Sequence, residues 1–262
     1  TINLTLNNFL IFNKTFGVLD NTEDGYSVIE TSDQGYAVLG NTGANNKDIL
    51  LLKIDSYGNQ IWIQSYGGSQ YDEARHFQET FDGGFIISGI TKSYGYGEED
   101  VWIIKTNESG LMDWNVKFGD TQNDRGAQIL QTDEGGYIVI GEKYNIDLEN
   151  SDLWLLKINS QGELSWEKTL GSAGDDKGYD IKNNRSGGYL LLGSTNSYGN
   201  GGSDIWLINT DSNGNELWSK TYGSSNNEYG RSIIDANDGG YLIFATSESF
   251  GNDNTGLHNT YV

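Results

Sequence analysis

The chain of 262 residues contains no cysteine and no proline. Without cysteine it can form no disulfide, and it offers neither a thiolate nucleophile nor a cysteine-rich zinc site. Without proline, its turns must be made by glycine, asparagine, aspartate and serine. The missing cysteines leave the compartment open, because exported and internal proteins alike can lack them.

Positive charge is scarce as well. The chain carries 16 lysines and arginines against 37 aspartates and glutamates, which gives a net charge of -21 and a pI near 4.2. Such a surface repels a phosphate backbone, so nucleic acid is not an expected partner. It attracts divalent cations or a basic partner, and it also keeps a protein soluble without any partner.

Long apolar runs are missing too. No stretch approaches the roughly 20 apolar residues that span a bilayer, so we expect no transmembrane segment. The first residues, "TINLTLNNFLIFNKTFG", lack a basic region and are interrupted by asparagine and threonine. They do not read as a signal peptide, and an exported chain would carry its signal outside this sequence.

Glycine and aromatic residues are abundant instead. The chain has 36 glycines and 12% aromatic residues, while apolar residues make up only 35%. This mixture favours many short strands and turns, with the core divided among repeated layers.

A repeat of 52 residues organises most of the chain. Trp62, Trp114, Trp166 and Trp218 follow one another at this step. Other columns keep it: Trp102, Trp154 and Trp206; Asp48, Asp100, Asp152 and Asp204; and the glycine pairs that begin at Gly83, Gly135, Gly187 and Gly239. A period near 50 with glycine pairs and tryptophan is typical of a β-propeller or a similar array.

Each repeat predicts four strands. In the fourth repeat these are expected at about Gly178–Lys182, Gly188–Thr195, Asp204–Thr210 and Leu217–Gly223. The second and third strands are almost continuously apolar, as expected for sheets covered on both faces by neighbouring blades. The last strand alternates and carries a lysine, which suits an outer edge.

The repeated tryptophans are expected to pack in the core. A tight hairpin would bring the strands of Trp206 and Trp218 together, with both side chains against adjacent blades. The alternative is a tryptophan platform for a sugar ring.

The ends of the chain predict a closed ring. Leu10–Gly17 resembles the fourth strand of a repeat, whereas the last repeat ends without one. The N-terminal strand would then complete the C-terminal blade and remove two open edges. We expect an all-β, five-bladed propeller of four-stranded antiparallel blades in a single domain, 1–262. The blades are expected at about 18–66, 68–118, 120–170 and 172–222, with a fifth made of 224–262 plus 9–17.

The pattern "DGGY…G…S.G….D.W..KT…G…W.KT.G" resembles the tandem β-propeller repeats of secreted and cell-surface proteins in bacteria and archaea. The resemblance covers almost the whole chain and implies a propeller on the outside of the cell. It implies no single activity, because the repeat hosts many functions. The hairpin before Trp218 is similar to the Asp-box of sialidase-like propellers, but its tryptophan lies one residue further on, so no sialidase site is carried over.

Residues for catalysis are few. His76 falls in a first strand, where a satisfied polar group is the ordinary role, and His258 falls in the irregular last segment. No zinc-protease, phosphate-loop, nucleophile-elbow or EF-hand motif is present.

An acidic residue recurs just before the first strand of every repeat. The five are Glu23, Asp72, Asp124, Asp176 and Glu228. In a propeller they would ring one mouth of the central channel and favour Ca²⁺ or a cationic ligand, with no other cofactor expected. The alternative is that each side chain bonds local backbone N–H groups in a turn.

The loops between the second and third strands are expected on the same face. One column in them holds Tyr94, Ile146, Tyr198 and Phe250, and Tyr96 and Tyr144 lie nearby. A ring beside polar groups can stack on a sugar, so the tyrosines and Phe250 are candidate ligand-binding residues. Alternatively each ring pins its loop to the next blade, a role that Ile146 could also fill.

These observations predict an extracellular or cell-surface, non-catalytic module that binds a glycan or a surface protein. One alternative is a self-assembling subunit of a surface layer or filament. Another is a glycoside-active enzyme, which needs two carboxylates in unlike environments. The candidate acids occupy equivalent positions, which suits repeated binding better than catalysis, and no catalytic residue is assigned.

Overall fold

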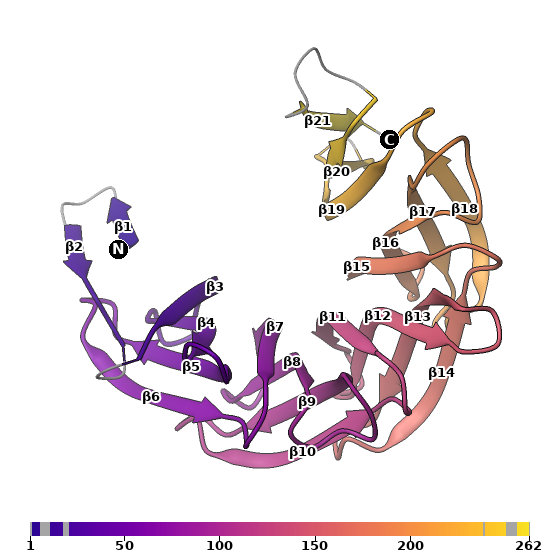
Figure 1. Ribbon diagram of the computed structural model, residues 1–262. Helices are drawn as coiled ribbons and strands as arrows, with labels where there is room; N and C mark the ends of the chain where they lie inside the picture. Colours follow the sequence, from indigo (N-terminus) through magenta and orange to yellow (C-terminus); the bar gives the residue numbers. More distant parts are fainter. Residues whose placement is uncertain (1, 6–10, 18–20, 238, 250–255, 262) are drawn as a thin grey trace. The chain divides into compact units, whose positions relative to one another are not determined.

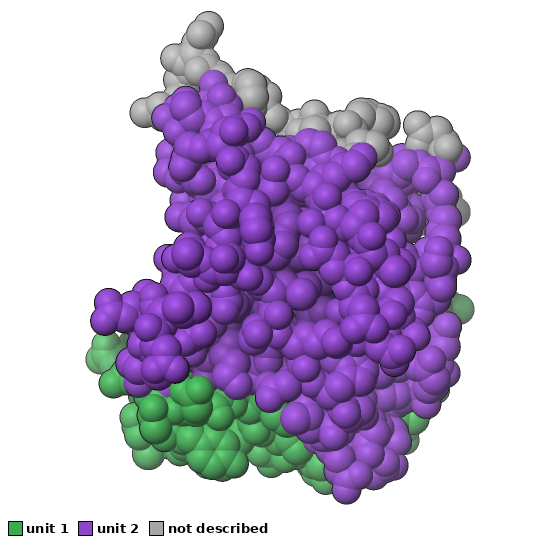
Figure 2. Space-filling model, turned by 90° about the vertical axis from the view of Figure 1, so that its right-hand side faces the viewer, with its two compact units in different colours: residues 1–121 green, residues 122–262 purple. Residues whose placement is uncertain are grey.

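The computed structural model describes the backbone of residues 2–5, 11–17, 21–237, 239–249 and 256–261, and the side chains of 13–17, 21–237 and 239–249. The chain divides into two compact units, residues 1–121 and 122–262 (Figure 2). Within the described part, no helix is long and apolar enough to cross a membrane.

The first unit holds a hairpin and two four-stranded sheets (Figure 1). The hairpin pairs β1 (Ile2–Thr5) with β2 (Ile11–Lys14). The first sheet contains β3 (Glu23–Glu30), β4 (Tyr36–Thr42), β5 (Asp48–Ile54) and β6 (Gln60–Tyr66). The second contains β7 (Asp72–Glu79), β8 (Phe85–Thr91), β9 (Asp100–Thr106) and β10 (Met112–Phe118).

The second unit holds three more sheets. The third sheet contains β11 (Arg125–Gln131), β12 (Tyr137–Asn145), β13 (Asn150–Ile158) and β14 (Leu164–Leu170). The fourth contains β15 (Asp176–Asn183), β16 (Tyr189–Thr195), β17 (Asp204–Thr210) and β18 (Glu216–Tyr222). The fifth has three described strands, β19 (Glu228–Asp235), β20 (Tyr241–Ser247) and β21 (Gly256–Tyr261).

The all-β prediction is confirmed, and so is the assignment of four antiparallel strands to each of the four full repeats. Every sheet is a simple meander, because consecutive strands are hydrogen-bonded neighbours. The predicted blade limits of 18–66, 68–118, 120–170 and 172–222 each enclose one of these sheets. In the fifth sheet the residues from Gly256 to Tyr261 form a third strand, β21, along β20.

The first strand of every sheet carries a bulge at the same place. In β15 the register shifts between Gly178 and Asp180, and the other first strands shift at the equivalent residues. A bulge adds one residue to one strand and increases its twist. The repetition of this bulge shows that the sheets share their backbone detail and not only their strand count.

The turn before each fourth strand is stabilised by the side chain of its first residue, which accepts hydrogen bonds from the turn's backbone. Asp55 Oδ1 accepts hydrogen bonds from the backbone N–H groups of Tyr57 (2.9 Å) and Asn59 (2.8 Å). The matching turn in the fourth sheet repeats this through Asp211. Gly58 has a φ of 75°, which favours glycine because side chains with a Cβ rarely adopt it.

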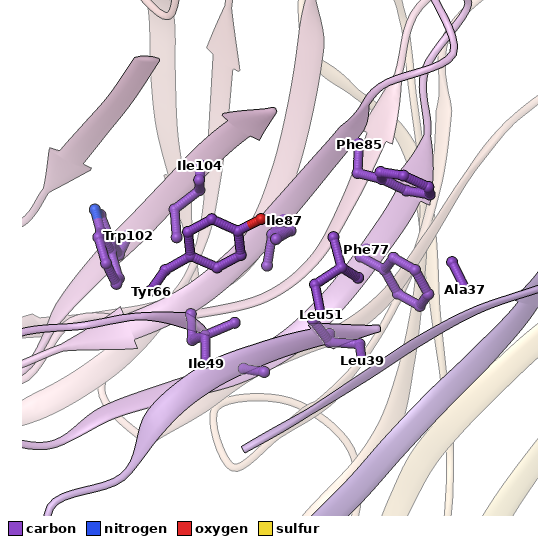
Figure 3. Packing of buried hydrophobic residues seen from close by; sticks show 11 residues of the cluster. Ala37, Leu39, Ile49, Leu51, Tyr66, Phe77, Phe85, Ile87, Trp102 and Ile104 are labelled. Carbon is purple, nitrogen blue, oxygen red and sulfur yellow. The ribbon is translucent and has the colours of Figure 1, made fainter. Parts of the chain in front are cut away.

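The cores lie between neighbouring sheets of one unit. In the first unit Leu39, Leu51, Phe77 and Ile104 belong to one cluster, and all are at most 1% exposed. Figure 3 shows side chains of the first sheet facing those of the second. Two equivalent clusters in the second unit join the third sheet to the fourth and the fourth to the fifth. In the second and fourth sheets the almost continuously apolar second and third strands are buried on both faces.

The two tryptophans of a repeat differ in burial, which corrects the expectation that both lie in the core. Trp206 on the third strand is 3% exposed, as expected, but Trp218 on the fourth strand is 39% exposed. Trp62 and Trp166, its counterparts, are half-buried and pack against the clusters of their units. A turn of the next sheet covers them: a Cβ on Gly110 would lie 2.8 Å from the Trp62 ring, and one on Gly214 would lie 2.7 Å from the Trp166 ring.

The N-terminal strand β2 is paired with β1 in this structure. The sequence predicts that this strand completes the C-terminal sheet, and that pairing stays a prediction. Phe16, just after β2, packs against Leu52 and Ile54 of the first sheet.

Candidate functional site

The repeated acids lie where one sheet meets the next. We call the contact of the first sheet with the second the first junction, that of the third with the fourth the second junction, and that of the fourth with the fifth the third junction. Asp72 and Asp176 are 0% exposed, and Glu228 is 1% exposed. These carboxylates begin β7, β15 and β19 and are removed from solvent.

Asp72 and Asp176 hold their junctions in the same way. Asp72 Oδ2 accepts hydrogen bonds from the N–H of Gly68 (2.8 Å) and from Ser93 Oγ (2.6 Å). Asp176 Oδ2 accepts the equivalent bonds from the N–H of Ser172 (3.1 Å) and from Ser197 Oγ (2.6 Å). One oxygen of each carboxylate therefore bonds a local backbone N–H group, as in the alternative to a metal site given above.

A second carboxylate from the preceding sheet approaches each of these acids. Asp48 begins β5 and Asp152 is the third residue of β13. At the second junction a Cβ placed on Gly171 would lie 2.1 Å from Asp152 Oδ1 and 2.5 Å from Asp176 Oδ2. At the first junction a Cβ on Gly67 would lie 1.9 Å from Asp48 Oδ1. A glycine is therefore required at both positions, since any side chain would collide with a carboxylate.

The pairs contain buried oxygen atoms without hydrogen-bond partners. These are Oδ1 of Asp48, Asp72, Asp152 and Asp176. Burial raises the pKa of the Asp48 carboxyl, and repulsion from Asp72 raises it further. Burial and repulsion from Asp176 raise the pKa of Asp152 in the same way. Each pair is therefore a place where negative charge is concentrated and incompletely compensated.

The third junction differs, because its acids are better satisfied. Glu228 Oε2 accepts a bond from the N–H of Ser224 (2.9 Å), and its Oε1 accepts bonds from Ser247 Oγ (2.8 Å) and the N–H of Ser249 (3.2 Å). Burial alone would raise the pKa of Glu228, but these bonds outweigh it and lower the pKa. Asp204 Oδ2 accepts a bond from the N–H of Asn200 (2.7 Å).

Glu23 and Asp124 complete the set of repeated acids. Glu23 begins β3 and is half-buried, and a Cβ on Gly17 would lie 2.7 Å from its Oε2. Asp124 is 0% exposed, and its Oδ1 accepts a bond from the N–H of Tyr144 (3.0 Å). Among the residues that the structure describes, no three or more His, Cys, Asp or Glu side chains come together in a group that could hold a metal ion.

Tyr94 and Tyr198 are placed alike in the loops after β8 and β16. The Tyr94 hydroxyl donates to the carbonyl of Gly67 (2.6 Å), and that of Tyr198 donates to the carbonyl of Gly171 (3.3 Å). Their rings pack against Trp102 and Trp206, with centroids 5.2 Å apart in each case. The rings pin their loops across the junction, yet Tyr94 is 41% exposed and Tyr198 is 45% exposed.

The remaining candidate aromatics lie in separate places. Tyr96 is 63% exposed, and Lys117 Nζ lies 5.4 Å from the centre of its ring. Tyr144 is half-buried near the end of β12. Phe250 lies outside the described residues. Of the two histidines, His76 is half-buried in β7, and the side chain of His258 is also outside the described part.

The pairing of the carboxylates was not predicted from the sequence. Both columns of acids keep the 52-residue step, but the two members of a pair belong to different repeats. The signal was the constant interval of 24 residues from Asp48 to Asp72, from Asp152 to Asp176 and from Asp204 to Glu228. An interval that joins the third strand of one repeat to the first strand of the next marks a contact between sheets.

Comparison with known proteins supports the fold and no more. No protein-family profile matches the chain, and no curated protein matches it. A protein of unknown function from Bacteroides caccae is similar in structure, with 15% identity, 84% of this chain and 70% of that chain covered, and a TM-score of 0.53. At this identity the likeness shows a shared fold alone.

Two enzymes are more weakly similar. A GH43 beta-xylosidase/alpha-arabinofuranosidase from a compost microbial metagenome matches at 10% identity over 93% of this chain and 92% of that chain, with a TM-score of 0.46. A mannose phosphorylase from Leishmania mexicana matches at 11% identity over 85% and 80%, also with a TM-score of 0.46. Likenesses at this level carry no argument about activity.

Proposed function

We propose that the chain is an extracellular or cell-surface β-propeller that acts as a non-catalytic binding module for glycans. Its five blades would be closed by the N-terminal strand, and its ligands would contact the loops after the second strand of each blade. The extracellular placement rests on the resemblance of the repeat to secreted and cell-surface propellers.

A matching contact supports the propeller arrangement. Lys168 Nζ on the fourth strand of the third sheet donates to Asn215 Oδ1 in a turn of the fourth sheet, at 2.8 Å. Lys14 Nζ, at the end of β2, donates to Asn59 Oδ1 in the same turn of the first sheet, also at 2.8 Å. The β2 strand therefore lies against the first sheet as the fourth strand of a preceding blade would.

The single observation that carries the binding role is the equivalent presentation of Tyr94 and Tyr198. Each hydroxyl and one ring face are fixed by the protein, while more than two-fifths of each side chain is exposed. A rigid ring with an open face can stack on a sugar at little cost in side-chain entropy. Repetition at equivalent sites would let a polymeric ligand be bound at several points at once.

The buried state of the repeated acids supports the absence of catalysis. A glycosidase needs an acid and a second carboxylate that both reach the glycosidic bond. Asp72 and Asp176 are fully buried, and each has one oxygen bonded to backbone and serine. These acids join sheets and are removed from solvent, which supports a structural role for them.

A glycan array with two variants tests this function. Wild type is expected to bind a defined set of glycans, and Tyr94→Ala with Tyr198→Ala is expected to lose at least about tenfold in affinity, because each lost stacking contact is worth about 1 kcal/mol. Tyr57→Ala is the control, because Tyr57 is 61% exposed but lies in the turn between β5 and β6, at the other end of the strand. Circular dichroism checks that all three proteins fold.

The absence of glycan binding together with concentration-dependent oligomers would contradict this function and favour the second one, assembly into a surface layer or filament. One observation supports that alternative. The first sheet has an apolar groove lined by Val28, Val38, Leu50 and Ile63, and Val28 is 48% exposed although its counterpart Phe77 is 1% exposed. Release of reducing sugar from a bound glycan would instead favour the glycosidase alternative.

A further inference from the structure

We propose that the first and second junctions each bind one divalent cation of the calcium type, held between Asp48 and Asp72 and between Asp152 and Asp176. This goes beyond the glycan-binding function, which uses the exposed loops. It also differs from a ring of equivalent acids around a channel, because each site joins two different strands of neighbouring sheets.

Each pair contains carboxylate oxygens that accept no hydrogen bond from the protein and could bind a cation. Asp72 and Asp176 are 0% exposed, and each has one oxygen bonded to protein donors and the other without a partner. The buried Oδ1 atoms of Asp48 and Asp152 are also without partners. Calcium binds carboxylate oxygens in flexible geometry and completes its shell with carbonyl oxygens or water.

The electrostatics of each pair favour a bound cation over bare carboxylates. Two like charges held close together repel each other, and a cation bound between them would offset that repulsion. The net charge of -21 raises the local concentration of cations around the whole molecule.

The tyrosine of the overlying loop belongs to the same arrangement. At the first junction this residue is Tyr94, which follows Ser93 in the loop after β8. The hydroxyl and Ser93 Oγ both bond atoms at the junction, to Gly67 and Asp72 respectively. A cation at the pair would therefore connect the two sheets and the loop above them.

The third junction serves as an internal control. Glu228 replaces aspartate there, both of its oxygens accept bonds from Ser224, Ser247 and Ser249, and neither is without a partner. A carboxylate that is already satisfied gains less from a cation, so we expect weak or no binding at this junction.

Thermal unfolding in calcium and in chelator tests the proposal. For wild type, about 1 mM Ca²⁺ is expected to raise the midpoint by about 4 °C or more relative to EGTA, because a ligand that binds only the folded state stabilises it. Asp48→Asn with Asp152→Asn removes one carboxylate from each pair without removing the bonds to Gly68 and Ser172. This variant is expected to melt below wild type in calcium but at or above wild type in EGTA, where it relieves repulsion.

That reversal of order cannot come from a damaged fold, which would melt lower in both solutions. The matched variant Asp204→Asn is expected to keep the full calcium effect. Terbium luminescence, excited through the aromatic rings beside the sites and displaced by Ca²⁺, gives a second readout that the Asp48→Asn, Asp152→Asn variant should lose. An equal midpoint of wild type in calcium and EGTA, or an unchanged calcium effect in the double variant, would overturn the proposal.

Discussion

The first and third junctions are built from the same repeat, yet they differ at three equivalent positions. At the first, Trp62 Nε1 donates to the carbonyl of Glu108 (3.2 Å), and the Tyr66 hydroxyl donates to that of Gly110 (2.6 Å). At the third, Trp218 is 39% exposed, and the buried Tyr222 hydroxyl has no hydrogen-bond partner. The acid pairs differ too, since Asp72 at the first junction has one oxygen without a partner and Glu228 at the third has none.

The difference shows what the hairpin between the third and fourth strands contributes. In the second sheet that hairpin covers Trp62 and accepts the bond from Tyr66. The fifth sheet has only three described strands, so its described part offers no such hairpin to Trp218 and Tyr222. The fourth-strand tryptophan is therefore a residue of the contact with the next sheet more than of the core of its own sheet.

Replacement of the two tryptophans should give the largest difference in stability between the first and third junctions. Trp62→Ala is expected to lower the free energy of unfolding by about 2–3 kcal/mol, because it removes a half-buried ring that packs on Phe85 with centroids 5.8 Å apart. Trp218→Ala is expected to lower it by about 1 kcal/mol or less, since 39% of Trp218 is exposed and the described part of the fifth sheet has no hairpin to cover its ring. Urea denaturation of both variants measures the difference, and equal losses would show that the third junction is as well covered as the first.

The two tyrosine hydroxyls provide a smaller and more specific comparison. Tyr66→Phe is expected to cost about 1 kcal/mol, because it removes the bond to Gly110 and leaves its carbonyl with one fewer donor. Tyr222→Phe is expected to be neutral or slightly stabilising, as the hydroxyl it removes is buried without a partner. The same denaturation experiment distinguishes them; a loss at Tyr222 like that at Tyr66 would mean that its hydroxyl has a partner.

The smallest expected effect is the loss of stability in acid. The two sheets of the first unit contain a lysine–aspartate bond that the fourth sheet lacks. Lys53 and Lys105 are buried ammonium groups bonded to Asp33 and Asp82 in the turns of their own sheets. The bond from Lys53 lowers the pKa of Asp33 from its usual 3.8 to about 2. Burial would raise the pKa of Asp82, but bonds from Thr80 and Lys105 lower it to about 2. The fourth sheet has Asn209 at the lysine position, bonded to Asn184.

A carboxylate with a lowered folded-state pKa stabilises the protein above its unfolded-state pKa, and this contribution disappears as the pH falls through the folded-state value. Asp33 and Asp82 should therefore lose their contribution between about pH 4 and pH 2. Both side chains are more than half exposed, so the effect is expected to be modest. Melting midpoints from pH 7 to pH 2 should fall less steeply for Asp33→Asn with Asp82→Asn than for wild type; parallel curves would contradict this.

The sequence predicted the sheets well because each repeat carries its own strand and turn signals. Asp204–Thr210 was predicted with the bounds that the structure has, since its apolar run starts at the repeated aspartate and ends before the turn at Asp211. What it could not predict depends on contacts between repeats. The exposure of Trp218 and the approach of Asp48 to Asp72 are set by a neighbouring sheet, which periodicity within one repeat does not describe.

The candidate site shows the same limit. The sequence indicates the repeated acids, but whether each bonds a turn or a cation depends on how its two oxygens are used. In Asp72 one oxygen has protein donors and the other has none, so the two alternatives apply to different atoms of one side chain. Residue type and spacing carry no information at that level.

Amide hydrogen exchange in calcium and in chelator tests the difference between the junctions most directly. The N–H groups of Gly68, Ser172 and Ser224 donate to the acids of the first, second and third junctions. Calcium is predicted to slow exchange at Gly68 and Ser172 by about tenfold or more and to leave Ser224 unchanged. Equal exchange in both solutions at Gly68 and Ser172, or an equal calcium response at Ser224, would contradict the account.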